Sequence, residues 1–203
     1  MTIYSARDRR GHTIDSRETA PAAMEPDSAS KGFAGLGTFL QQRVSGMSVG
    51  VPGTVRAWES ALREFGTISL RRALKPGIQT ARRGFVVDQT FFNQTDAAKE
   101  IFADFAATAA LYLDPDGTPR DVGTVIRNRD MAATYELIAR RGPQAFYTGS
   151  LARDIVRTVT HPPERAGATR VVRPGVMTLA DLARYRTIDR DPTAISYRGL
   201  DVF

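Results

Sequence analysis

The residues with the clearest chemical potential form a short run at the end of a predicted strand, Thr13-Ile-Asp-Ser-Arg-Glu-Thr-Ala-Pro21. An arginine in such a place can turn its guanidinium into a cleft and bind a carboxylate through two parallel hydrogen bonds. Arg17 is the candidate for this role. The alternative is a surface ion pair with Asp15 or Glu18, worth about 0–1 kcal/mol. Spacing alone favours the surface pair, because arginine–acid neighbours are common.

Three other candidate sites carry a weaker signal. Gly50-Val-Pro-Gly-Thr54 precedes a predicted helix, where backbone N–H groups can hold an anion. The Lys and Ser/Thr order of a phosphate loop is missing there, so a tightly packed helix start is the better interpretation. His161 is expected to cap a helix or lie in solvent rather than act as a base. Asn93-Gln-Thr95 matches a glycosylation sequon, but it lies within a predicted helix.

The composition removes several kinds of catalytic centre. The 203 residues contain no cysteine and two histidines, His12 and His161. Disulfides, Cys-ligated zinc, iron–sulfur clusters, thiol nucleophiles and a three-histidine metal site are therefore excluded within this chain. Neither a metal nor an organic cofactor is implied.

Arginine dominates the charge of the chain. Lys plus Arg number 28 against 22 Asp plus Glu, for a formal net charge of +6, and only three of the cations are lysines. Arginine suits carboxylate or phosphate ligands, but a codon-biased, high-GC genome, in which arginine replaces lysine on solvated faces, explains the same balance and is favoured. The pairs at 71–72, 82–83 and 140–141 are predicted on different helices without interleaved aromatics. Nucleic-acid binding needs a contiguous basic face, so it is not expected.

A framework of strands at both ends of the chain must position these residues. Alternating patterns predict strands at 1–6 and 12–15 around a turn at 8–11. Two further short strands are predicted within 194–203, around Arg198-Gly199. Because short strands need a larger sheet and bare edges invite aggregation, we expect the chain to be a segment of a larger α/β structure.

Apolar residues at helical spacing predict five helices between these strands. The five stripes are Val55–Phe65, Leu70–Ala81 (with Pro76 expected to bend it), Phe91–Phe105, Met131–Ile138 and Leu151–Val159. A capping box at Thr178–Asp181 predicts one more short helix, running through Tyr185. Residues 28–37 are predicted as a loop, and 161–175 as a flexible surface loop. No membrane-spanning segment and no signal peptide is predicted in this chain.

Short motifs follow one another along most of the chain, and their joint order is more specific than any one of them. They are Ile14–Pro21, Val49–Thr54, Phe65–Thr67 with Leu74–Pro76, Ala81–Phe85, Asn128–Thr134, Gly142–Tyr147 with Gly149, Met177–Tyr185 and Tyr197–Gly199. In this order they resemble the large-subunit region of the γ-glutamyltransferases, also called glutathione hydrolases. The regions around 25–46 and 161–174 match poorly.

The resemblance implies a fold, a reaction and a role for one residue. The fold is helix-rich α+β, a partial αββα N-terminal-nucleophile hydrolase with short β-hairpins at both ends, and residues 1–203 form a single partial domain. In the family, the precursor cuts itself, and the new N-terminal threonine of the small subunit attacks the γ-amide of glutathione. Water or an acceptor amino acid or peptide then takes the γ-glutamyl group. The position of Arg17 binds the α-carboxylate of that group, so the resemblance overturns the surface-pair preference.

No catalytic residue is carried over to this chain. The family's cleavage site is a Thr-Thr-His run, from which Val159-Thr-His-Pro162 differs in neighbours and location. The nucleophile, the glycine-rich oxyanion segment and the paired serines are expected beyond Phe203, and a leading strand and signal sequence before Met1. The implied partners are glutathione or another γ-glutamyl compound and the missing small subunit of the same precursor. The parent protein is expected to be periplasmic or extracellular.

An alternative hypothesis of a non-enzymatic function remains open. The chain is alternatively a non-catalytic helical binding or scaffold module that kept the large-subunit helices and lost the enzyme. Such a module would need a stable fold without additional strands.

Overall fold

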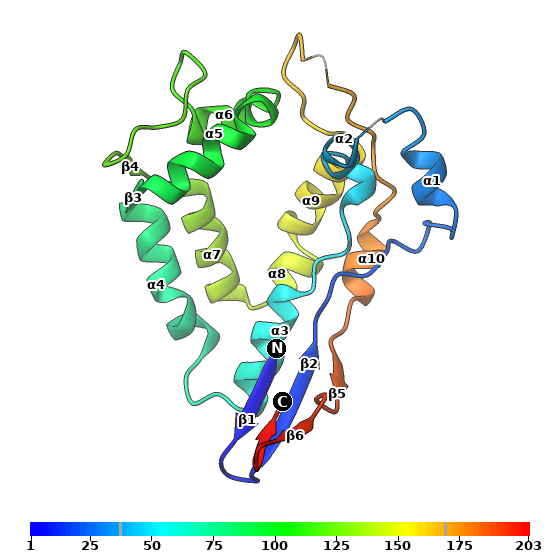
Figure 1. Cartoon of the computed structure of the whole chain (residues 1–203), viewed down its shortest axis with the longest axis vertical. Helices are drawn as coiled ribbons and strands as arrows, with labels where there is room; N and C mark the ends of the chain where they lie inside the picture. Colours follow the sequence, from blue (N-terminus) through cyan, green and yellow to red (C-terminus); the bar gives the residue numbers. More distant parts are fainter. Residues whose placement is uncertain (37, 169) are drawn as a thin grey trace.

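The small antiparallel sheets formed by the two ends of the chain lie at one end of the molecule, and a further two-stranded sheet lies among the helices that make up the rest, as the computed structural model shows for residues 1–36, 38–168 and 170–203 (Figure 1). The strands are β1 (Thr2–Ser5), β2 (Arg10–Asp15), β3 (Phe85–Val86), β4 (Val125–Ile126), β5 (Ile188–Arg190), β6 (Ile195–Tyr197) and β7 (Leu200–Val202). Within the described residues they form three sheets, ordered β1-β2-β5, β3-β4 and β6-β7.

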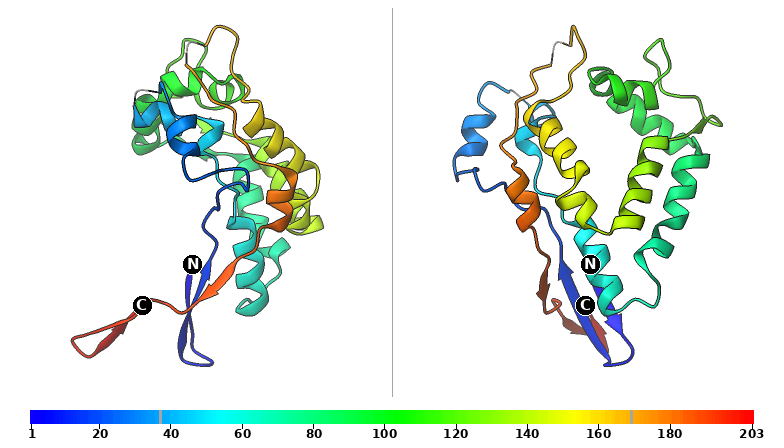
Figure 2. Two further views of the ribbon diagram at one scale, coloured as in Figure 1. Left: turned by 90° about the vertical axis from the view of Figure 1, so that its right-hand side faces the viewer. Right: turned by 180° about the vertical axis from the view of Figure 1, so that it is seen from behind.

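Both predicted terminal hairpins are confirmed. β1 pairs antiparallel with β2, and Thr13 of β2 also lies opposite Arg190 of β5. The β6–β7 hairpin turns at Arg198 and Gly199, whose φ angles of 51° and 78° fit a two-residue hairpin turn. Figure 2 shows this second hairpin projecting from the body. Every residue of β6 and β7 is exposed. The third strand of the β1-β2-β5 sheet, β5, was not predicted.

The five helices predicted from apolar spacing are present, and so is the short helix behind the capping box. They are α3 (Thr54–Glu64), α4 (Leu70–Arg83), α5 (Gln89–Ala103), α7 (Arg129–Arg141), α9 (Ser150–Thr160) and α10 (Leu179–Arg184). Side chains of Ser69, Asp88 and Asn128 accept hydrogen bonds at the starts of α4, α5 and α7. Helix α4 runs on through Pro76.

Several short helices were missed by the sequence analysis. They are α1 (Ser28–Gly32), α2 (Phe39–Arg43), the 3₁₀ turn η1 (Gly46–Ser48), α6 (Ala106–Tyr112) and α8 (Gln144–Tyr147). The loop predicted at 28–37 is therefore wrong for its first half, and residue 37 lies outside the described residues. Phe105, predicted in the third helix, instead caps the start of α6.

The segment 161–175 has no helix or strand among its described residues, as predicted, and it makes hydrogen bonds to the helices; residue 169 lies outside the described part. The Gly46 N–H donates to the Arg173 carbonyl at 2.7 Å, and the Gly175 N–H donates to the Val159 carbonyl at 2.8 Å. Arg170 Nε lies 2.7 Å from Asp104 Oδ2, with both side chains largely buried. Most of the described residues of the segment are exposed, so the prediction of a surface loop is confirmed, and these contacts tie the loop to the helices. Its flexibility stays a prediction.

The core lies where α3, α4, α7, α8, α9 and α10 meet. Its buried members are Val51, Val55, Leu74, Ile138, Tyr147, Ala152, Val159, Met177, Leu182 and Tyr185. Tyr147 is fully buried at its centre. This core is built next to the end of β2, so it can fix the backbone that carries Arg17.

Candidate functional site

The backbone around Arg17 is held in place on both sides. Strand β2 ends at Asp15, and the Arg17 N–H donates to Asp15 Oδ1 at 3.1 Å. Two residues later, Thr19 pairs with Val51, whose N–H donates to the Thr19 carbonyl at 2.8 Å. The chain is thus extended and anchored where Arg17 leaves the sheet.

A third anchor comes from the far end of the sequence. Tyr185 Oη donates to the Arg17 carbonyl at 2.8 Å. The Tyr185 ring stacks on Tyr147, with ring centres 6.0 Å apart and planes inclined by 11°. The Arg56 guanidinium lies 4.5 Å from the centre of the Tyr147 ring, a cation–π contact. We call Arg56, Tyr147 and Tyr185 the aromatic column; it connects the buried core to the Arg17 backbone.

The hydroxyl groups of the aromatic column stay protonated at neutral pH. Burial raises the pKa of Tyr147 to about 12. Burial also raises the pKa of Tyr185, with a further contribution from the negative charges of Asp15 and Glu18. Tyr147 Oη donates to the Pro52 carbonyl at 2.8 Å. Both tyrosines therefore remain hydrogen-bond donors to backbone carbonyls.

Close packing at Gly53 explains the glycine-containing run before α3. A Cβ at Gly53 would lie 2.0 Å from Tyr185 Oη and 2.2 Å from the Ser16 carbonyl oxygen. Real Cβ atoms do not approach so closely, so the residue before α3 must lack a side chain. This confirms the tightly packed helix start that was preferred over an anion-binding loop.

The Arg17 side chain itself points into solvent. Its exposed fraction is 84%, and its Nε lies 3.2 Å from Glu18 Oε1. The surface pair favoured by spacing is therefore present in this chain. An exposed pair of this kind is worth about 0–1 kcal/mol, so a substrate carboxylate can replace Glu18 at little cost.

Asp15 is occupied elsewhere, which explains why Glu18 is the partner of Arg17. Asp15 Oδ2 accepts a hydrogen bond from Arg190 Nε of β5 at 2.7 Å. That bond, together with the Arg17 N–H, holds the pKa of Asp15 below its usual value. The charged Asp15 carboxylate thus ties β2 to β5.

The remaining sequence candidates stay apart from Arg17. His161 is exposed at the end of α9, as predicted, and its Nδ1 lies 2.9 Å from Thr160 Oγ1. The Thr160 hydroxyl is also 2.8 Å from the Val156 carbonyl, an ordinary helix contact that competes for its proton. Thr95 of the sequon is buried within α5. Two of the arginine pairs, 71–72 and 82–83, share α4 rather than lying on different helices.

Neither a metal centre nor a membrane-spanning helix is found in the part of the chain that the structure describes. Across residues 1–36, 38–168 and 170–203, no three His, Asp or Glu side chains gather as a metal site would require. Over the same ranges, no helix combines the length and apolar character needed to cross a bilayer.

The chain matches a known protein family along its whole length. The whole of residues 1–203 matches the family described as Gamma-glutamyltranspeptidase. The chain is 36% identical over 193 residues to a glutathione hydrolase of Aspergillus flavus, and 36% identical over 201 residues to an acylase ACY 1 proenzyme of a Pseudomonas species. It superimposes on the crystal structure of Helicobacter pylori gamma-glutamyltranspeptidase with a TM-score of 0.84 at 25% identity.

The matches cover nearly all of this chain but only part of each relative. They extend over 93% and 96% of the present sequence, yet over 29% and 34% of the two curated relatives. The solved structure is covered to 54%, against 100% of this chain. The helix-rich α+β chain therefore corresponds to part of a known N-terminal-nucleophile hydrolase fold.

Proposed function

Because the chain belongs to the gamma-glutamyltranspeptidase family, we propose that it provides the substrate-carboxylate site of an enzyme that cleaves γ-glutamyl amides. The observation that carries the proposal is the contrast at Arg17. Its backbone is fixed by Asp15, Val51 and Tyr185, whereas its guanidinium is exposed and weakly paired. A rigid backbone with an available guanidinium is the arrangement that a carboxylate-binding site requires.

In the proposed reaction, Arg17 binds the α-carboxylate of a γ-glutamyl compound such as glutathione through two hydrogen bonds. This contact orients the γ-amide toward a nucleophilic threonine supplied by the remainder of the protein. The threonine oxygen attacks the γ-carbonyl carbon, and the amine leaves with a proton. The resulting γ-glutamyl ester is then attacked by water or by an acceptor amine, which regenerates the threonine hydroxyl.

The partners and location belong to the same proposal. The partner is the small subunit of the same precursor, and the parent protein acts in the periplasm or outside the cell. Some relatives are named acylases rather than glutathione hydrolases. The group that Arg17 recognises in the donor is the α-carboxylate, and the rest of the donor need not be that of glutathione.

A non-catalytic scaffold is the second candidate. It is favoured by the buried core around Tyr147, which this chain builds from its own helices. A scaffold of this kind would keep the fold and show no γ-glutamyl turnover.

The test is Arg17→Lys in the complete natural protein that contains these residues. Lysine keeps the charge but loses the planar pair of donors, so KM for γ-glutamyl-p-nitroanilide should rise about tenfold or more with kcat nearly unchanged. Arg153→Lys, at an exposed position on α9, is the matched control and should leave KM unchanged. An unchanged KM in Arg17→Lys would remove the assignment, and a wild-type protein without turnover would favour the scaffold.

A further inference from the structure

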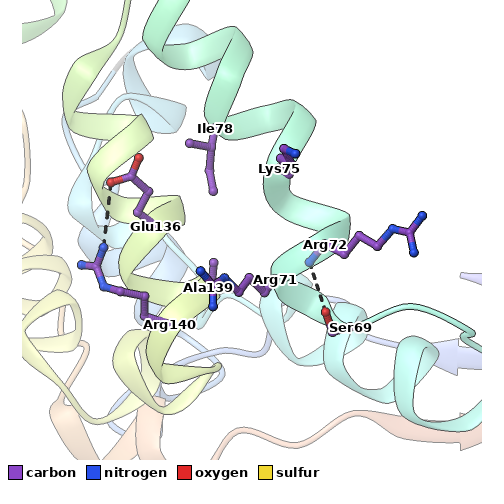
Figure 3. A pocket seen from close by; sticks show the side chains of 8 residues that line it. All are labelled: Ser69, Arg71, Arg72, Lys75, Ile78, Glu136, Ala139 and Arg140. Atoms are coloured by element: carbon purple, nitrogen blue, oxygen red, sulfur yellow. Dashed lines mark hydrogen bonds and ion pairs between the residues drawn. The ribbon is translucent and has the colours of Figure 1, made fainter.

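A basic groove lies between α4 and α7, and it shares no residue with the Arg17 site. Arg71, Arg72 and Lys75 line it from α4, and Arg140 and Glu136 line it from α7 (Figure 3). The volume of the groove is about 550 Å³. The two helices pack along each other in Figure 1, so cations far apart in the sequence converge on one cavity.

The groove carries far more positive than negative charge. Within the described ranges, Arg71, Arg72 and Lys75 have no acidic side chain within ion-pair distance. Of the described residues that line the groove, Glu136 is the one acid, and it is shared between two arginines: it pairs with Arg82 and lies 3.9 Å from Arg140. One carboxylate is therefore too little negative charge to neutralise the cations that surround it.

The placement of these cations is unfavourable for the helix that carries them. Arg71 and Lys75 are like charges one turn apart on α4, and such pairs repel each other. Arg71 and Arg72 also lie in the first turn of α4, which has no acidic residue, where the helix dipole disfavours positive charge. An anion in the groove would relieve both effects, which is a physical reason for cations in these positions.

We infer that the groove binds a small molecule through a phosphate or pyrophosphate group. Guanidinium groups bind phosphate oxygens through paired hydrogen bonds, and a lysine adds a compact charge. In Figure 3, Arg71 reaches across the groove toward Ala139, whereas Arg72 extends away from α7. Arg140 lies beside Glu136 and extends away from α4. Arg71 and Lys75 are therefore the direct ligands, and Arg72 and Arg140 contribute through their charge.

The shape and lining of the groove favour a small molecule over a nucleic acid. Its volume falls within the range of about 300–1,000 Å³ that is usual for small-molecule sites. None of the described side chains that line it is aromatic, so it offers no platform on which bases could stack. Ile78 and Ala139 give it an apolar floor, on which the uncharged part of an organic phosphate can lie.

The test is calorimetric titration of the complete natural protein with pyrophosphate at constant ionic strength. The variant Arg71→Gln/Lys75→Gln removes two groove cations, and each lost charge-assisted contact should weaken binding by about fivefold or more. The control Arg83→Gln/Arg141→Gln removes the same amount of charge from positions of α4 and α7 outside the groove, and affinity should change by less than about twofold. Citrate serves as a carboxylate anion of similar charge.

Thermal unfolding without added anion checks that the variant is folded. Because repulsion is relieved, Arg71→Gln/Lys75→Gln should unfold at the wild-type temperature or above it. The inference is overturned if wild-type protein does not bind pyrophosphate, or if both double variants lose affinity equally, which would mean diffuse attraction only. It is also overturned if citrate binds as tightly as pyrophosphate, since the groove would then not select phosphate.

Discussion

At the scale of single residues, Arg17 illustrates what sequence reasoning can and cannot supply. Its place after a predicted strand, and its motif, identify it as a candidate from the sequence. The hydrogen bond from Tyr185 to its carbonyl joins positions 168 apart in sequence, and no local pattern predicts such a contact. The choice between Asp15 and Glu18 as partner likewise depends on Arg190, whose strand was not predicted.

The Tyr185→Phe variant tests the positioning role of the aromatic column. It removes the hydroxyl that donates to the Arg17 carbonyl and keeps the ring that stacks on Tyr147. The free energy of unfolding should fall by about 1 kcal/mol, as for a typical lost hydrogen bond. If the hydroxyl also orients Arg17, KM for a γ-glutamyl donor should rise about threefold with little change in kcat.

The control for this variant is Tyr4→Phe, which alters an exposed tyrosine of β1. It should change neither stability nor KM. A Tyr185→Phe protein with lowered stability but wild-type KM would show that the hydroxyl is purely structural.

At the scale of elements, long periodic stripes predicted α3, α4, α5, α7 and α9, because each helix places its apolar residues along one face. The short α1, α2, α6 and α8 were missed, since helices of so few residues owe their stability to tertiary packing rather than to a pattern of their own. Strand β5 was missed because Ile188 is its single apolar residue. The capping box before α10 was predicted correctly, because its hydrogen bonds are local.

Asp181 joins α10 to the segment after the Arg17 motif. Its carboxylate accepts hydrogen bonds from Thr178 and from the Ala22 N–H, the latter at 3.0 Å. Burial acts to raise its pKa, but these hydrogen bonds outweigh burial and the pKa lies below the ordinary 3.8. Its contribution to stability is therefore present above pH 3.8 and is lost as the pH falls through the lowered pKa.

The Asp181→Asn variant should accordingly lose about 0.5 kcal/mol at neutral pH, because amide oxygens accept weaker hydrogen bonds than carboxylates. The difference from the wild type should shrink as the pH is lowered below 3.8. Urea unfolding of both proteins at neutral and acidic pH measures it. A difference that stays constant with pH would contradict the role of the charged carboxylate.

At the scale of the whole molecule, a loop adds a further link between two groups of helices that already meet in the core. Figure 1 shows α4, α5, α6 and α7 on one side and α8, α9 and α10 on the other. Asp104, at the end of α5, accepts from Arg170 and from the Arg165 N–H of the loop that follows α9. These contacts were not predicted, because the Pro, Gly and Arg residues of the loop do not reveal an acidic partner that is distant in the sequence.

Arg170→Ala should destabilise the protein by about 3 kcal/mol, because it leaves the largely buried Asp104 carboxylate without its cation. Arg157→Ala is the matched control: its pair with Asp154 is exposed, so the loss should be about 0–1 kcal/mol. Denaturant unfolding measures both. Equal effects in the two variants would show that the link between the helix groups contributes little.

The projecting β6–β7 hairpin is the other feature of the whole molecule. Ile195, Tyr197, Leu200 and Val202 expose 45–66% of their surface. Relatives extend well beyond the matched part, since this chain covers 29% and 34% of their lengths. We expect the remainder of the enzyme to cover these apolar side chains and to bring its threonine to the Arg17 site.

Release of p-nitroaniline from γ-glutamyl-p-nitroanilide by the purified 203-residue chain tests this division of roles most directly. If Arg17 supplies binding and another part of the enzyme supplies the nucleophile, the chain alone should release no more product than buffer, and the complete protein should turn the substrate over. Steady turnover by the 203-residue chain on its own would contradict the account.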